Sequence, residues 1–68
     1  MDLKASIKKA TRYLESLMGP ASEGLCIQLE RCKSESDFLA KVSEVQRILA
    51  ISRSEKKAAE FVAATLGP

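Results

Sequence analysis

Residues 19–24 read Gly-Pro-Ala-Ser-Glu-Gly, and their two glycines have the spacing found in phosphate-binding loops. In such a loop the backbone N–H groups hold the phosphates, while a following Lys and then a Ser or Thr reach the phosphate oxygens and the metal ion. Leu25 and Cys26 stand at those two positions, and no strand signal precedes the loop. The sequence therefore predicts no nucleotide site.

Nucleophilic catalysis would require a serine or cysteine beside a general base. The chain has no histidine, which is the commonest general base and a common ligand of transition metals. Most serines fall at expected helix starts, where capping accounts for them. The carboxylates of Glu35 and Asp37 fall in an expected first helical turn, where they complement the helix dipole. We therefore expect no catalytic residues and a protein that is not an enzyme.

The two cysteines, Cys26 and Cys32, are six residues apart within an expected helix. This spacing separates them by about 120° around the axis and ~9 Å along it. A disulfide needs Cα atoms within ~7 Å, so it would have to break the helix. Without histidine or a second pair of cysteines, the spacing is no zinc pattern either. We expect reduced thiols that pack as small apolar side chains, no metal or other cofactor, and a cytoplasmic protein.

Strong helix formers dominate the chain, and strand signals are weak. Its 68 residues, 46% of them apolar, fit a single domain over residues 1–68. The pattern predicts an all-α fold, a small bundle of three or four helices. The expected helices cover residues 3–18, 22–33, 35–51 and 53–66.

Capping residues define several of these boundaries. Asp2 is expected to cap the first helix, and Gly19 followed by Pro20 is expected to end it. Ser34 and Asp37 have the spacing of a capping box at the start of the third helix.

The boundary between the last two helices depends on Ile51. This residue falls outside the apolar arc of its helix, so a break near it would remove the need to expose it. Ser52 and Glu55 have the spacing of a second capping box. Because neither Gly nor Pro lies there, one continuous kinked helix is the alternative.

Three large apolar side chains lie off the main apolar seams of the expected helices: Tyr13, Ile27 and Phe61. A chain of this size is near the lower limit for independent stability, so we expect it to gain stability from a partner chain. These three side chains are accordingly the expected anchors of a protein interface, in a homodimer or with another protein.

Lys4, Lys8 and Arg12 form a basic stripe on the face opposite the apolar seam of residues 3–18. The stripe is expected either to be a solvated helix face or to dock an acidic partner. Binding to a membrane surface is disfavoured because no Trp or Phe anchors the apolar face. No apolar stretch approaches the ~20 residues of a membrane span.

Residues 48–59 resemble the core of a helix-turn-helix motif, in which a Ser/Arg/Lys-rich second helix enters the DNA major groove. On that resemblance Arg53, Lys56 and Lys57 would contact DNA. The segment departs from the motif because its turn has no Gly, and Glu55 and Glu60 would face the phosphates with the wrong charge.

The sequence thus predicts a small cytoplasmic protein-interaction module that acts as a regulator, adaptor or inhibitor and self-associates. Its partner is expected to be a protein, with no small-molecule substrate and no membrane. The alternative is a small DNA-binding regulator that uses residues 45–66.

Overall fold

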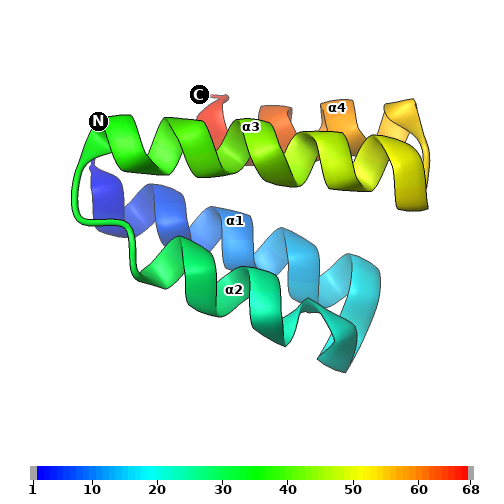
Figure 1. The fold of residues 1–68 in the computed structure, drawn as a ribbon, viewed down its shortest axis with the longest axis horizontal. Coiled ribbons are helices and arrows are strands. Elements are labelled where there is room, and N and C mark those ends of the chain that lie inside the picture. The colour runs from blue at the N-terminus through cyan, green and yellow to red at the C-terminus, as the bar shows by residue number, and fades with distance from the viewer. Residues whose placement is uncertain (1, 68) are drawn as a thin grey trace.

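The computed structural model describes residues 2–67, and this part of the chain is all-helical and without strands (Figure 1). It confirms the expected all-α fold with four α-helices. In chain order the elements are α1 (Leu3–Met18), the 3-10 turn η1 (Gly19–Ser22), α2 (Glu23–Glu30), α3 (Glu35–Ser52) and α4 (Glu55–Leu66).

Helix α1 begins and ends where the capping residues predicted. The carboxylate of Asp2 accepts a hydrogen bond from the backbone N–H of Ala5 at 3.3 Å. Gly19 ends the helix at φ 60° and ψ −137°, a conformation that residues with a side chain adopt only under strain. Pro20 then starts η1, which turns the chain into α2. The glycine therefore decides where the first hairpin of helices turns.

Helix α2 is shorter than expected and ends at Glu30 rather than at residue 33. The last turn tightens, because the N–H of Cys32 bonds to the carbonyl of Leu29, three residues back, at 3.1 Å. Two residues later Ser34 is extended and accepts from the N–H of Asp37 at 3.2 Å. Because the cap of α3 requires an extended Ser34, the chain must leave helical geometry before that residue.

Helices α3 and α4 are separate, so the continuous kinked helix is wrong. Arg53 breaks the helical path at φ −122° and ψ −87°. Ser54 then caps α4, accepting from the N–H of Lys57 at 3.1 Å. The expected start of the last helix at residue 53 is therefore two residues too early.

The predicted capping box at Ser52 is also wrong. The Ser52 hydroxyl instead donates to the carbonyl of Ile48 within α3, at 2.8 Å. The break does not remove Ile51 from water either, since Ile51 stays in the last turn of α3 and is 83% exposed.

The four helices form two antiparallel pairs, α1 with α2 and α3 with α4, and the pairs stack on each other (Figure 1). The most extensive packing joins α3 to α4 and α1 to α4, while α2 and α3 touch less. The buried core takes residues from every helix: Ala10, Leu14, Cys26, Leu29, Phe38, Val42, Val45, Leu49, Ala58 and Phe61. Across residues 2–67, no helix combines the length and apolar character needed to cross a membrane.

Candidate functional site

Tyr13 and Phe61, two of the expected interface anchors, pack against each other inside the bundle. Their ring centroids are 5.9 Å apart and the ring planes are tilted by 50°. Phe61 is completely buried, because the apolar face of α4 points between α1 and α3. The prediction of Phe61 as an exposed anchor is therefore wrong, and Tyr13 is half-buried beside it.

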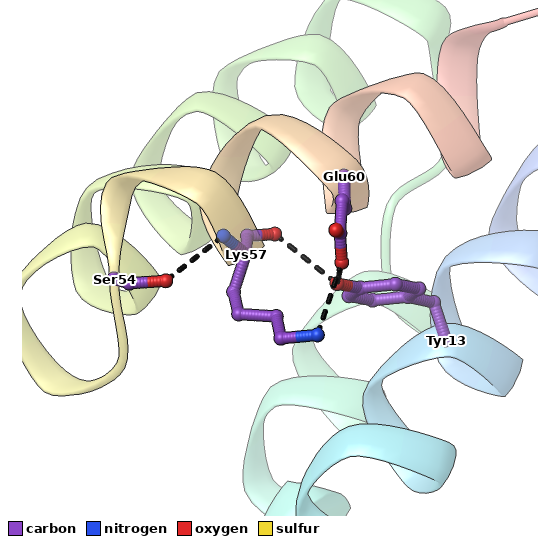
Figure 2. Close-up of polar contacts among 4 residues, drawn as sticks. All are labelled: Tyr13, Ser54, Lys57 and Glu60. Carbon is purple, nitrogen blue, oxygen red and sulfur yellow. Dashed lines mark hydrogen bonds and ion pairs between the residues drawn. The ribbon is translucent and has the colours of Figure 1, made fainter.

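The hydroxyl of Tyr13 on α1 forms hydrogen bonds to α4 (Figure 2). It lies 3.2 Å from the backbone carbonyl of Lys57 and 3.3 Å from Oε1 of Glu60, so its one proton has two acceptors. Nζ of Lys57 forms an ion pair with the same Glu60 oxygen at 3.2 Å. Ser54, which caps α4, orders the turn that presents Lys57.

Charges in this cluster hold Tyr13 neutral and Glu60 ionised. The pKa of Glu60 is lowered, first by its hydrogen bond with Lys57 and also by that with Tyr13. The pKa of Tyr13 is raised from 10.0, first by burial and then by the negative charge of Glu60. Each shift moves the pKa of its group further from neutral pH, so neither group is suited to proton transfer at that pH. The cluster acts as a link between helices.

The two thiols are unbonded, as predicted. Cys26 is buried, and its Sγ donates to the carbonyl of Thr11 at 3.8 Å. Burial is the largest cause that raises the pKa of Cys26 and of Cys32, which makes both poor nucleophiles. Within residues 2–67, no three side chains of the metal-ligating types come together.

The basic stripe of Lys4, Lys8 and Arg12 is exposed along α1. Over the described part of the chain the ion pairs are Lys41–Glu44 and Lys57–Glu60, so none of the three stripe residues has an acidic partner within residues 2–67. The stripe is available to a partner.

Among residues 2–67, five large apolar side chains are exposed: Ile27, Leu39, Ile48, Ile51 and Leu66. Ile27, an expected anchor, is 42% exposed on α2. Ile51, 83% exposed, lies one turn from Ile48, which is 39% exposed. We call Ile48 and Ile51 the α3 patch. The sequence already placed Ile51 outside the apolar arc of its helix, and this position is the signal that indicates the patch. It was missed because a helix break near Ile51 was expected to remove the exposure.

An open groove of about 550 Å³ runs between α1 and α2. Ile27 and Cys26 contribute its apolar part, and its charged lining residues are all acidic: Glu15, Glu23 and Glu30. Sequence reasoning missed this groove, because η1 is what folds α2 back beside the end of α1.

The residues of the DNA-binding alternative do not form a helix-turn-helix. That motif crosses its two helices at ~90–120°, whereas α4 runs back along α3 (Figure 1). Lys57 is held by Glu60, while Arg53 and Lys56 are exposed. DNA binding stays a prediction that this geometry does not favour.

Comparisons with protein-family models, curated proteins and solved structures find no match to this chain. The surface of the chain itself is therefore what indicates its function.

Proposed function

We propose that this chain is a small non-enzymatic protein-interaction module, a regulator, adaptor or inhibitor, that self-associates and binds a protein partner. The observation that carries the proposal is the 83% exposure of Ile51, about twice that of any other large apolar side chain in residues 2–67. A cytoplasmic location fits the two unbonded cysteines.

The α3 patch supplies the apolar contact. Burying one aliphatic side chain of this size contributes about 1.5–3 kcal/mol. Ile48 and Ile51 are three residues apart on one helix, so a single partner surface covers both. Single exposed apolar residues are common on protein surfaces, and it is the adjacency of these two that favours an interface.

The basic stripe of α1 supplies the charge. Its three side chains are exposed and have no ion pair within residues 2–67. Exposed charges of this kind mainly raise the rate of association and orient the partner, while apolar anchors hold it. The complement that we expect is an acidic protein surface, on a second copy of this chain or on another protein.

The test is affinity capture from the native cell with three immobilised proteins: wild type, Ile51→Lys and Ala63→Lys. The two variants add the same charge near the C-terminal end of a helix, where a cation is favourable. Ala63 is an exposed residue of α4 and serves as the matched control.

We expect a protein that wild type and Ala63→Lys both retain and that Ile51→Lys loses by at least tenfold. Equal retention by all three proteins would refute the α3 patch as the binding surface. Recovery of nothing beyond blank resin would contradict the interaction function itself.

A further inference from the structure

The outer face of the α1–α2 pair carries opposite charges at separate positions. Lys4, Lys8, Arg12 and then Glu15 follow one another at intervals of four, four and three residues, which places them on one side of α1. Glu15 lines the groove between α1 and α2, opposite Glu23 and Glu30. The basic stripe therefore continues directly into the acidic groove.

Ile27 lies near the middle of this arrangement. The neighbouring Cys26 contacts the carbonyl of Thr11, so Ile27 is level with about Ala10 or Thr11 on α1. Lys4 and Glu15 are eleven residues apart, roughly 16 Å along the helix, and Ile27 is close to halfway between them. Its side chain is 42% exposed on this face.

We infer that this face binds a second copy of the same chain in an antiparallel, two-fold symmetric dimer centred on Ile27. The inference rests on the self-association in the proposed function and names the surface that performs it. A two-fold axis pairs each position with its counterpart across the axis. With the axis in the groove beside Ile27, α1 of one copy lies over α2 of the other, so that Lys4 lies near Glu23 of the other copy and Arg12 near Glu30.

Charge complementarity is what selects a second copy as the occupant. Both the basic and the acidic residues of the face lack an ion pair within residues 2–67. The antiparallel arrangement sets Lys4 and Arg12 of each copy against Glu23 and Glu30 of the other and covers the two Ile27 side chains. Because these charges are exposed, the dimer dissociates more readily at high salt.

The experiment is sedimentation equilibrium of the full chain, which has a monomer mass of 7.4 kDa. One variant reverses the basic side, Lys4→Glu/Arg12→Glu, and a second reverses the acidic side, Glu23→Lys/Glu30→Lys. In a symmetric dimer each variant alone sets like charges against each other, so each should weaken self-association at least tenfold. A mixture of the two variants places opposite charges at every pair and should restore a dimer, now of one chain of each kind.

Two further variants separate this surface from the α3 patch. Ile27→Lys should weaken the dimer, while Ile51→Lys should leave it unchanged. Circular dichroism of each variant should show wild-type helicity, which separates lost association from lost folding.

The outcomes distinguish the two proposals. A wild-type dimer that both charge variants and Ile27→Lys leave intact, or one that Ile51→Lys abolishes, overturns this surface but keeps self-association. Failure of the mixed variants to recover also overturns it. A wild type that sediments at 7.4 kDa at every concentration up to about 1 mM overturns the self-association itself.

Discussion

The ring of Tyr13 on α1 packs against the ring of Phe61 on α4, and the Tyr13 hydroxyl reaches past it to the backbone carbonyl of Lys57. This contact joins the first helix to the last across 48 residues of sequence. The aromatic pair is therefore part of what closes the bundle, and its energetics can be measured by substitution.

Phe61→Ala should unfold a large fraction of the protein. Phe61 is fully buried, and removing such a ring costs about 3–5 kcal/mol. A domain of this length has a total stability of about 3–10 kcal/mol. Urea titration followed by circular dichroism measures the loss. Phe61→Leu, which keeps more of the apolar volume, should cost clearly less, and Ile51→Ala, at an exposed position, should cost little. A stable, fully folded Phe61→Ala protein would contradict the core role.

Tyr13→Phe should keep the ring contact and lose only the hydroxyl. The expected loss is about 1 kcal/mol in the free energy of unfolding, which is typical of one hydrogen bond. Glu60→Gln should have a smaller effect, because the hydroxyl can still donate to the carbonyl of Lys57. The same urea titration compares the two variants. A larger loss for Glu60→Gln than for Tyr13→Phe would show that the carboxylate, and not the carbonyl, is the main acceptor.

Thr65→Val should stabilise the protein. Thr65 is 1% exposed, and its hydroxyl has no hydrogen-bond partner among the described residues. Replacing it with a methyl group of similar size removes a buried polar group and should gain about 1 kcal/mol. The control is Ser22→Ala, because the equally buried Ser22 hydroxyl donates to the carbonyl of Gly19 at 2.7 Å. Ser22→Ala should lower the midpoint of thermal unfolding while Thr65→Val raises it. A shift of both thermal midpoints in the same direction would contradict this prediction.

Alkaline pH should destabilise the fold. The folded state raises the pKa of Tyr13 above 10.0 and that of Cys26 above 9.0, in each case first by burial. Both groups therefore bind their protons more tightly in the folded than in the unfolded chain. The stability that they contribute is complete below about pH 9 and is lost as the pH rises through their raised pKa values.

Urea midpoints between about pH 7 and pH 11 test the direction of this change. The wild type should lose stability above about pH 9, and Tyr13→Phe/Cys26→Ala should lose less over the same interval. Cys32, whose pKa is also raised, remains in the variant and accounts for part of its residual slope. A midpoint that stays level or rises with pH in the wild type would contradict the prediction.

The sequence by itself determined the helical class and most helix ends, because these depend on local chemistry. Asp2, Gly19 and Ser34 act on backbone groups within a few residues, and each does what its type and position predicted. The end of α2 was misplaced because the extended Ser34 that caps α3 makes the chain leave helical geometry earlier. The start of α4 was misplaced because two neighbouring serines compete to cap it. Ser52 bonds backward into α3, which leaves Ser54 to start α4.

Only the tertiary structure decided which off-seam side chains meet and which remain exposed. The angular position of Phe61 and of Ile51 around the helix axis shows that each lies away from the apolar seam of its helix. Whether such a residue is buried depends on which other helices pack on that side. The antiparallel return of α4 places Phe61 against Tyr13, whereas nothing in residues 2–67 covers Ile51. The acidic groove arises in the same way, because η1 sets α2 beside the end of α1. Local pattern thus specified the helices, and long-range packing specified the surface that is left for a partner.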